Sequence, residues 1–360
     1  MSAQKPTVVH LLRSTTISGA ERVALQIMGL TAESYDTVYV SPKGDIEHYV
    51  TEAGMRYYGL EKANVGCVRR AIKDIRPDII HAHDFMMSAL AVLAHTGVPV
   101  VSHLHNNPPW LKNPLFPGSL AFAMVAPWLK AIITVSSSVE NEYVYRRVLG
   151  NRVRVLPNVV DGERVRRMAK EDTRFDVPEK PFLMFLGRLA EPKNPLAFVR
   201  IMGSLRDAGV DVRGVMAGDG EMRDEVRGLV QELGLEDRVD MLGFVENPYP
   251  LLVQASALVM PSTFEGFGLA AVEAMCLGIP VFASPVGGLV DVVDAASGRL
   301  CSDEAEFAKE LAALLSGGSE ATFPPDAVQR SSERFCDLED YREGIEAVYR
   351  ALDTSRRPTT

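Results

Sequence analysis

Short runs of β-branched and aliphatic residues recur along the first half of the chain, and a helical pattern of apolar positions follows them. Such runs are typical of buried strands. Strands that alternate with helices indicate βαβ units on a parallel sheet that is covered on both faces. The predicted strands are residues 7–12, 37–41, 78–83, 98–104, 131–136 and 152–157.

A second series of the same kind begins after a polar, charged segment between about Asp161 and Lys180, which has the composition of a linker. We therefore expect an α/β protein with two doubly wound, Rossmann-like domains that face a cleft. The first domain covers residues 1–165 and the second covers residues 166–335. The predicted strands of the second domain are residues 182–187, 212–218, 239–245, 257–262 and 280–285.

The end of the chain, residues 336–360, predicts an amphipathic helix followed by a frayed tail. An apolar stripe of this kind needs a surface to pack on, so we expect the helix to close on another part of the protein. The residues of the stripe are Leu338, Tyr341, Ile345, Val348 and Leu352.

Composition and charge narrow the class of protein. The 360 residues are 47% hydrophobic and 24% charged, which is ordinary for a globular protein, and the net charge of −9 argues against nucleic acid as a partner. The first apolar run is too short for a signal peptide and no segment predicts a membrane span, which favours a cytoplasmic protein. Four cysteines form no C-x-x-C pair and are expected to be reduced and buried: Cys67, Cys276, Cys301 and Cys336.

The segment 261–288, "PSTFEGFGLAAVEAMCLGIPVFASPVGG", contains two carboxylates, Glu265 and Glu273, and no other charge. It predicts a strand end, a glycine loop and a helix whose N-terminal N–H groups favour a phosphate. Both carboxylates could face one cleft and accept hydrogen bonds from paired sugar hydroxyls. The alternative is structural: Glu265 caps the helix and Glu273 pairs with an arginine. Spacing alone leaves both interpretations open.

Other strand ends carry residues suited to a phosphorylated ligand. "FLGRLAEPKN" places the cations Arg188 and Lys193 after a strand, where they could clamp a diphosphate. "MAGDGEM" places Gly218 after another strand, although the G-x-G-x-x-G fingerprint of dinucleotide sites is missing. In the first domain, Gly19 lies in a loop before a helix and could let the backbone approach a ligand.

Four histidines stand at two predicted strand ends, His81 and His83 in "HAHD" and His103 and His105 in "HLHN". Zinc is one hypothesis, but the spacing matches no usual zinc signature. Alternate residues of a strand share one face, so imidazoles that form hydrogen bonds at the cleft are favoured over a metal site. A purely structural role stays open for each of them.

In this order the motifs closely resemble those of glycosyltransferase family 4, retaining enzymes of the GT-B fold. The resemblance covers nearly the whole chain, and its most specific element is the family's Glu-x(7)-Glu motif at Glu265 and Glu273. The other matching segments are "GAERVAL", "ITVSSSV", "LPNVVD", "GRLAEPKN", "GDGEMRDEV" and "LGFVENP".

The resemblance implies a role for each matching residue. Arg188 and Lys193 would hold the donor diphosphate, Glu265 would contact donor-sugar hydroxyls, and Glu273 would accept from the ribose hydroxyls. His105 would lie beside the reacting sugar carbon. The last helix would pack on the first domain. The backbone would serve the donor at Gly19, Gly218, Phe267, Gly268 and Leu269.

The resemblance also implies a reaction without a resident cofactor. No Asp-x-Asp is present, so cations and a helix N-terminus would do the electrostatic work and Mg²⁺ is not expected to be essential. The nucleotide sugar is a substrate, with UDP favoured and GDP open. Three departures concern loop shape: Ser18 and Val159 stand where the family commonly has glycine, and Asp291 stands where glutamate is commoner.

Residues 107–136 are the segment of the first domain considered for the acceptor. Their only charges are Lys112 and Lys130, and they contain both tryptophans. Two interpretations stay open: a core or subunit contact, or a helix that dips into the cytoplasmic face of the inner membrane, where Trp favours the interface. A lipid-linked acceptor follows from the second.

The resemblance therefore predicts a retaining, hexosyltransferase-type enzyme that moves a sugar from a nucleotide diphosphate to a saccharide or lipid-linked saccharide. Bacterial surface polysaccharide or glycoconjugate synthesis is the expected setting. The alternatives are a non-catalytic GT-B subunit that supports a partner, or a sugar-nucleotide epimerase. The sequence leaves undetermined the sugar, the base, the acceptor, the linkage and the oligomeric state.

Overall fold

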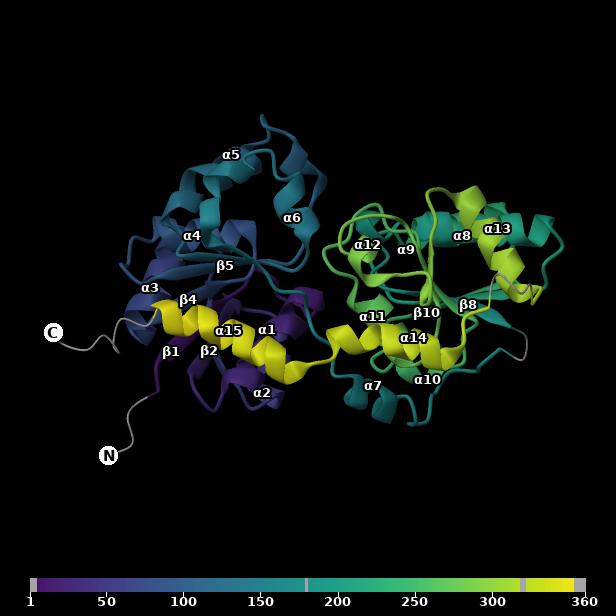
Figure 1. The fold of residues 1–360 in the computed structure, drawn as a ribbon, viewed down its shortest axis with the longest axis horizontal. Helices are drawn as coiled ribbons and strands as arrows, with labels where there is room; N and C mark the ends of the chain where they lie inside the picture. Colours follow the sequence, from purple (N-terminus) through teal and green to yellow (C-terminus); the bar gives the residue numbers. More distant parts are fainter. Residues whose placement is uncertain (1–4, 179–180, 318–321, 353–360) are drawn as a thin grey trace. The chain divides into compact units, whose positions relative to one another are not determined.

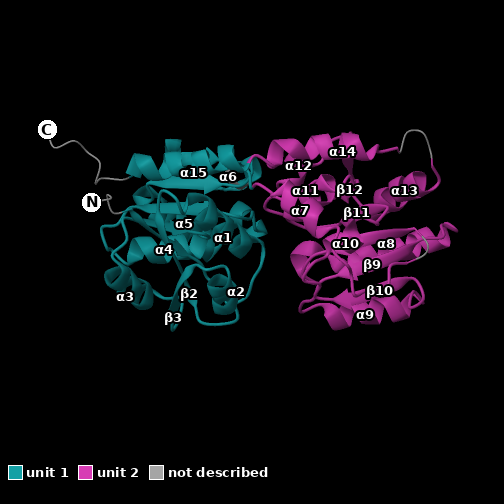
Figure 2. Cartoon of the chain, turned by 90° about the horizontal axis from the view of Figure 1, so that it is seen from below, with its two compact units in different colours: residues 1–158, 338–360 teal, residues 159–337 magenta. Residues whose placement is uncertain are grey.

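A computed structural model describes residues 5–178, 181–317 and 322–352. The chain forms two compact units (Figure 2). Unit 1 comprises the chain up to Asn158 together with the segment from Leu338, and unit 2 comprises Val159–Asp337. Each unit contains one parallel sheet and is described on its own.

The sheet of unit 1 has seven parallel strands in the order β3-β2-β1-β4-β5-β6-β7 (Figure 1). The sequence predicted all of them except β3, a strand at one edge. The strands are β1 (Thr7–Leu11), β2 (Asp36–Pro42), β3 (Arg56–Leu60), β4 (Ile79–Ala82), β5 (Val100–Leu104), β6 (Ala131–Thr134) and β7 (Val153–Val155).

Helices connect these strands, and several begin at a side-chain cap: Asn64 accepts from the N–H of Cys67, and Asp84 from that of Met87. The helices of unit 1 are α1 (Gly19–Thr31), α2 (Ile46–Glu52), α3 (Val65–Ile75), α4 (Phe85–Leu93), α5 (Pro117–Val125), α6 (Ser137–Glu142) and α15 (Leu338–Leu352), with 3₁₀ turns η1 (Pro109–Lys112), η2 (Ala126–Trp128), η3 (Arg146–Val148) and η4 (Gly150–Arg152).

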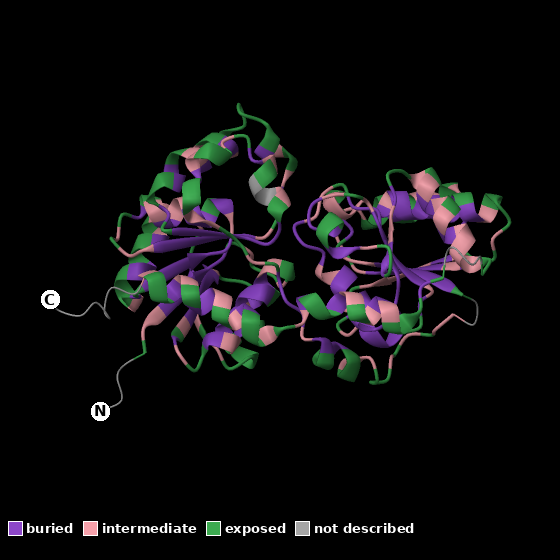
Figure 3. Cartoon of the chain, in the orientation of Figure 1, coloured by how far each residue is buried: buried purple, intermediate pink, exposed green. Residues whose placement is uncertain are grey.

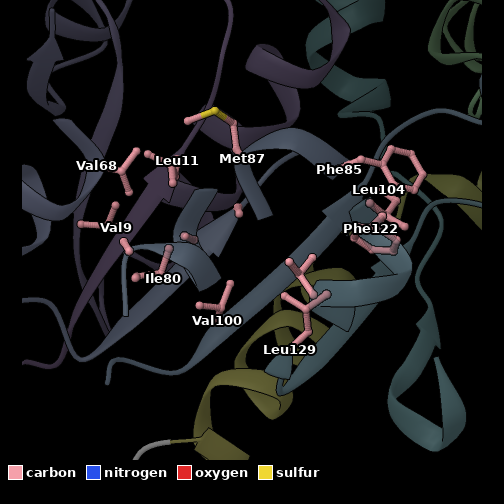
Figure 4. Close-up of a cluster of buried hydrophobic side chains, with 14 of the residues drawn as sticks. Val9, Leu11, Val68, Ile80, Phe85, Met87, Val100, Leu104, Phe122 and Leu129 are labelled. Carbon is pink, nitrogen blue, oxygen red and sulfur yellow. The ribbon is translucent and has the colours of Figure 1, made fainter. Parts of the chain in front are cut away.

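The core of unit 1 lies between the sheet and helices α3, α4 and α5 (Figure 4), and the central strands β4, β5 and β6 are buried along their length (Figure 3). Val9, Ile80 and Val100 come from three neighbouring strands, while Phe85 and Phe122 come from α4 and α5. Continuous apolar runs therefore form these strands because both faces of the sheet are covered.

The last helix, α15, belongs to unit 1 and packs against α1. Tyr341 and Ile345 of the predicted stripe are buried. Tyr349 and Glu346 are buried as well, and Arg342 and Arg350 hold the Glu346 carboxylate at 3.0 and 3.2 Å. The helix thus buries a broader face than the apolar stripe indicated, because paired polar groups can be buried too.

The sheet of unit 2 has six parallel strands in the order β10-β9-β8-β11-β12-β13. The sequence predicted the first five in chain order and missed the short edge strand β13. The strands are β8 (Phe182–Leu186), β9 (Arg213–Ala217), β10 (Val239–Gly243), β11 (Ala257–Met260), β12 (Val281–Ala283) and β13 (Gly298–Leu300).

The helices of unit 2 include α7, which starts inside the segment predicted as a linker. This helix packs against α10 and α11, so the units divide earlier in the chain than residue 165. The helices are α7 (Gly162–Met168), α8 (Pro195–Asp207), α9 (Arg223–Glu232), α10 (Tyr249–Leu252), α11 (Leu269–Cys276), α12 (Leu289–Val292), α13 (Glu304–Leu315) and α14 (Pro325–Ser332), with 3₁₀ turns η5 (Glu191–Lys193) and η7 (Glu333–Phe335).

Two further sequence expectations concern cysteines and membrane spans. All four cysteines are free, but only Cys276 and Cys301 are buried, while Cys67 and Cys336 are partly exposed. The Cys276 and Cys336 thiols lie 3.5 Å apart. Among the described helices, none combines the length and the apolar character that crossing a membrane requires.

Candidate active site

The strand order of unit 2 sets the place of the candidate site. Strands β8 and β11 are neighbours, but the chain passes from β8 to β9 on one side and from β11 to β12 on the other. Ligands of doubly wound sheets bind outside the carboxyl ends of the strands at such a switch point. Arg188 and Lys193 follow β8, and Glu265 follows β11. The structure therefore brings three of the predicted residues to this point.

Lys193 and Glu265 form an ion pair between the ammonium and one carboxylate oxygen. The two loops that carry them are joined by backbone as well, since the N–H of Thr263 donates to the carbonyl of Pro192 at 3.0 Å. The Glu265 side chain is only 13% exposed. A carboxylate so far removed from water needs a partner, and Lys193 provides it.

Arg188 lies at the same strand end but is exposed, and it forms no ion pair with any residue in the described ranges. Its guanidinium is thus accessible for an anion. The loop behind it is tight, because Gly218 has φ of 149° and a Cβ there would lie 1.8 Å from the carbonyl oxygen of Gly187. Only glycine fits between the ends of β8 and β9.

The loop after β11 leads into α11 through Gly268, whose φ of 97° favours glycine and where a Cβ would lie 2.6 Å from Leu289. Gly268 is the N-cap and no side chain caps the helix, so the alternative in which Glu265 is the cap is wrong. The Phe267 ring is buried and packs against the Phe335 ring, with the two ring centroids 5.4 Å apart. Phe267 can therefore offer a ligand its backbone but not its ring.

Glu273 lies one element further on, in α11, and is half-buried. The hydroxyl of Tyr249 donates to its carboxylate at 3.0 Å. Tyr249 is buried in α10, and the sequence analysis missed it, since nothing in a single tyrosine after a proline indicates a contact with a distant glutamate. This hydrogen bond fixes the orientation of the second carboxylate of the motif.

A cavity of about 580 Å³ lies at the same edge of the sheet. Of its lining residues, Asn194 follows Lys193 directly and Ser262 precedes Glu265 by three positions, but none of the predicted site residues lines it. Ser262 and Ser284 supply hydroxyls and Asp303 and Glu304 supply carboxylates, with no cation in the lining. The cavity therefore suits a neutral polar group better than a phosphate.

Unit 1 has its own switch point, between β1 and β4. Gly19 begins α1 there, after the N-cap Ser18, whose hydroxyl donates to the Glu21 carboxylate. Glu21 is buried, which raises the pKa of its carboxyl. Across the switch point, Arg13 approaches Asp84 at 3.6 Å. Gly19 thus lies at the strand end that the sequence predicted.

Five of the histidines of unit 1 form one cluster, which we call the histidine ladder. It contains the four histidines singled out in the sequence and a fifth, from β1, that the sequence analysis missed. His10 pairs in register with His81 across the β1–β4 ladder, so strand order was the missing signal. The members of the ladder are His10, His81, His83, His103 and His105.

Two hydrogen-bonded rows make up the ladder. In the first, His83 joins His10 (Nε2 to Nδ1) and His105 (Nδ1 to Nε2), each at 2.9 Å. In the second, His81 joins the hydroxyl of Tyr349 from α15 at 2.6 Å and Nδ1 of His103 at 3.2 Å. The rows stack on each other, with ring centroids 4.3 Å apart for His81 and His83 at the end of β4, and 4.2 Å apart for His103 and His105 at the end of β5.

Burial keeps these imidazoles neutral. It lowers the pKa of His10 and of His105 from 6.5 to about 3, and it lowers the pKa of the three others well below 6.5. The nitrogens of two triples, His10–His81–His83 and His83–His103–His105, lie within 4.8 Å of one another, close enough to hold a metal ion. However, most of the ladder nitrogens are already engaged in the hydrogen bonds of the two rows.

Two family models match the chain. The model described as Glycosyltransferase Family 4 matches residues 17–164, and the model described as Glycosyl transferases group 1 matches residues 169–323. The first match takes in most of unit 1, with Gly19 at the start of α1 and four members of the ladder. The second takes in most of unit 2, with Lys193, Glu265 and Glu273.

Among curated proteins, the 2-deoxystreptamine glucosyltransferase of Streptomyces kanamyceticus is 39% identical over 147 residues, which are 39% of this chain and 38% of that protein. The matched stretch thus spans well under half of that relative. A Campylobacter jejuni enzyme named GalNAc-alpha-(1->4)-GalNAc-alpha-(1->3)-diNAcBac-PP-undecaprenol alpha-1,4-N-acetyl-D-galactosaminyltransferase is 25% identical over 324 residues, which are 88% of this chain and 81% of that enzyme.

Solved structures support the fold. Alr3699/HepE of Anabaena, determined in complex with UDP, has a TM-score of 0.82 at 18% identity, with 96% of this chain and 100% of that chain covered. The sucrose-phosphate synthase of Thermosynechococcus elongatus has a TM-score of 0.78 at 18% identity, with 98% and 100% covered. With the two parallel sheets, these likenesses confirm the predicted fold class of two Rossmann-like domains, the GT-B fold.

The neutral ladder predicts that acid destabilises the protein below about pH 6.5. The unfolded chain takes up protons on its imidazoles there, while the folded ladder does not until its pKa values near 3 are reached. Each ladder histidine should therefore lower the free energy of unfolding by about 1.4 kcal/mol per pH unit between pH 6.5 and 4.5. Urea unfolding at pH 7, 6 and 5 measures this slope.

The variant His10→Asn should reduce the slope of the free energy of unfolding against pH by about 1.4 kcal/mol per pH unit, because it removes one buried imidazole and so one proton of uptake on unfolding. His48→Gln, at a histidine exposed on α2, controls for the loss of an imidazole as such. Equal slopes in the wild type and in His10→Asn would contradict a ladder that stays neutral when folded.

Proposed function

The chain belongs to glycosyltransferase family 4, and from this premise we propose that it transfers a sugar, with retention of configuration, from a nucleotide diphosphate to a saccharide or lipid-linked acceptor. The observation that carries the proposal is the Lys193–Glu265 pair at the switch point of unit 2. It joins a cation and a nearly buried carboxylate at the carboxyl ends of the strands, where doubly wound sheets bind ligands.

In this proposal the diphosphate lies between the strand ends and α11. Lys193 and the exposed Arg188 bind its oxygens by charge-assisted hydrogen bonds, which are stronger than neutral ones. The N-terminus of α11, which begins after Gly268 with no side-chain cap, adds backbone N–H groups. These groups stabilise the charge that develops on the leaving phosphate, so no metal ion is needed at this site.

The two carboxylates then recognise the sugars. When the diphosphate engages Lys193, the Glu265 carboxylate accepts hydrogen bonds from hydroxyls of the transferred sugar. Glu273, oriented by Tyr249, accepts from the ribose hydroxyls. Neither carboxylate acts as a base in this scheme. Both position the donor, and Glu273 does so while Tyr249 holds it, since a carboxylate held by a partner positions better than a free one.

The chemical step breaks the bond between the anomeric carbon and the phosphate oxygen and forms a bond to the acceptor oxygen on the same face. The leaving phosphate oxygen takes the acceptor proton, so charge and atoms balance without a protein base. His105 lies beside the reacting carbon in this scheme. UDP is the favoured nucleotide, supported by the UDP bound to the Anabaena protein, and GDP is the alternative.

We place the reaction in bacterial surface polysaccharide or glycoconjugate synthesis, in the cytoplasm or at the inner face of the membrane. The polyprenyl diphosphate in the name of the Campylobacter relative supports a lipid-linked acceptor. A non-catalytic subunit and an epimerase remain the competing functions. An epimerase would convert the nucleotide sugar in the absence of an acceptor. A non-catalytic subunit would not convert the nucleotide sugar at all.

Nucleotide binding tests this site. UDP at a hundred times its dissociation constant should add about 2.7 kcal/mol to the free energy of unfolding, with and without Mg²⁺. The variants Lys193→Ala and Glu273→Gln should lose most of this gain, because each removes a contact to the nucleotide. Thermal unfolding of the wild type and the variants with UDP, GDP, ADP and TDP measures this gain in stability.

Lys309→Ala is the matched control, because this lysine is 80% exposed on α13 and lies outside the site. It should keep the full gain. Stabilisation of the Lys193→Ala variant equal to that of the wild type would contradict the diphosphate clamp. If no nucleotide stabilises the wild type, the non-catalytic function is favoured.

A second observation favours membrane contact for the acceptor side. The outer face of α5 and its flanks exposes large apolar residues, and much of α5 is exposed in Figure 3. Leu115 is 88% exposed and Trp128 is 64% exposed, whereas Trp110 packs against Phe85. The exposed residues, four of them spaced by four, are Leu115, Phe116, Leu120, Met124 and Trp128.

Cations accompany this face. Lys112, Lys130, Arg146 and Arg147 are exposed in the same part of unit 1. An apolar helix face accompanied by cations binds an anionic membrane surface. The segment 107–136 is thus core on one side, through Phe122, and exposed on the other, and it is for the exposed side that membrane contact is proposed.

Vesicles with anionic lipid should bind the protein at low salt and shift the fluorescence of Trp128. Met124→Glu should weaken binding about tenfold or more, because it replaces apolar area buried in the lipid by a charge that anionic lipid repels. Tyr49→Glu, at an exposed aromatic residue on α2, is the control and should bind as the wild type does. Equal binding of the Met124 variant and the control would contradict the contact.

A further inference from the structure

The last helix of the chain reaches into the histidine ladder. Tyr349 of α15 is fully buried, and its hydroxyl lies 2.6 Å from Nδ1 of His81. His81 continues to His103, whose ring stacks on His105 at a centroid distance of 4.2 Å. A residue at the end of the sequence is therefore linked to the candidate histidine at the end of β5.

The tyrosine sets the direction of this row. A neutral imidazole has one N–H and one lone pair, so a row of imidazoles donates in one direction throughout. Among the described residues, the hydroxyl of Tyr349 has no acceptor other than His81. It therefore donates to Nδ1 of His81, and the Nε2–H of His81 donates to Nδ1 of His103. The row ends at an Nε2–H on His103.

The opposite direction carries a cost. If His81 donated to Tyr349, the tyrosine proton would be buried without an acceptor, at about 1–3 kcal/mol. The nitrogen at the other end, Nε2 of His103, is buried without a hydrogen-bond partner among the described residues in either case. The difference between the two directions thus lies at Tyr349, which selects one tautomer for His81 and His103.

The second row depends on the first through stacking. His105 is the only partly exposed member of the ladder, and it is held by one hydrogen bond to His83 and by the face of the His103 ring. His83 in turn stacks on His81 at 4.3 Å. Both rows end on β5 with a buried nitrogen that has no described partner, Nδ1 of His105 and Nε2 of His103.

We propose that Tyr349 is a positioning residue for His105: its hydroxyl fixes the tautomers of His81 and His103, and these rings hold His105 in one orientation. The last helix then contributes to the candidate active site as well as to the packing of unit 1. The proposal rests on the proposed function, because it is His105 at the reacting sugar that gives the fixed orientation its use.

The first test reads the ring nitrogens of the wild type. With ¹⁵N-labelled histidine, the spectra should show His81 and His103 each protonated at Nε2 and not at Nδ1. A His103 protonated at Nδ1 would overturn the proposal, because the row would then run toward Tyr349. Stoichiometric binding of Zn²⁺ by the ladder would overturn it too, since a metal ion would take the lone pairs that the rows use.

The second test uses Tyr349→Phe, which removes the hydroxyl and keeps the ring. His81 and His103 should become mixtures of tautomers, and kcat should fall about two- to tenfold, the range of one buried hydrogen bond, while KM for the donor stays unchanged. Tyr341→Phe is the matched control on the same helix, because the buried Tyr341 hydroxyl has no described partner. It should change neither the ring spectra nor kcat.

Two results overturn the proposal: ring spectra of Tyr349→Phe identical to those of the wild type, or altered spectra with an unchanged kcat. If the phenylalanine variant does not fold, the wild-type spectra still decide the direction of the row. If the wild type transfers no sugar, the proposed function fails, whereas the spectra of the variant still show whether Tyr349 fixes the tautomers.

Discussion

The ion pair between Lys193 and Glu265 is the contact on which the candidate site of unit 2 depends. It joins the two neighbouring strands from which the chain leaves in opposite directions, and it lets a carboxylate stand 13% exposed at the edge of an apolar sheet. The glycine turns at the ends of β8 and β9 bring the backbone close to this point. The ion pair and the glycine turns thus lie together at the switch point, where doubly wound folds bind their ligands.

In unit 1, the polar groups buried at the strand ends are neutral. Five imidazoles from three strands cost much to bury alone, and two rows of hydrogen bonds satisfy most of their nitrogens. Their lowered pKa values follow from burial and make the cluster a neutral scaffold rather than a charged one. The candidate site of unit 2 is therefore built on charged groups, whereas the ladder of unit 1 is built on uncharged ones.

The sequence predicted the central strands of each sheet, because their apolar runs are buried on both faces, and it also predicted the edge strands β7 and β10. It missed β3 and β13, edge strands with weaker patterns, and it could not separate the two interpretations of Glu265. It also missed His10, Tyr249 and Tyr349. Each of these completes a contact between elements that only strand order or helix docking brings together, as between His81 and Tyr349, so no local pattern indicates them.

A structure determined with UDP bound would show directly whether the nucleotide binds at the switch point of unit 2. We expect diphosphate oxygens within hydrogen-bond distance of Lys193 Nζ and of the Arg188 guanidinium, ribose hydroxyls at the Glu273 carboxylate, and Glu265 separated from Lys193. Density for UDP elsewhere, with the Lys193–Glu265 pair intact and no nucleotide atom near Glu273, would contradict it.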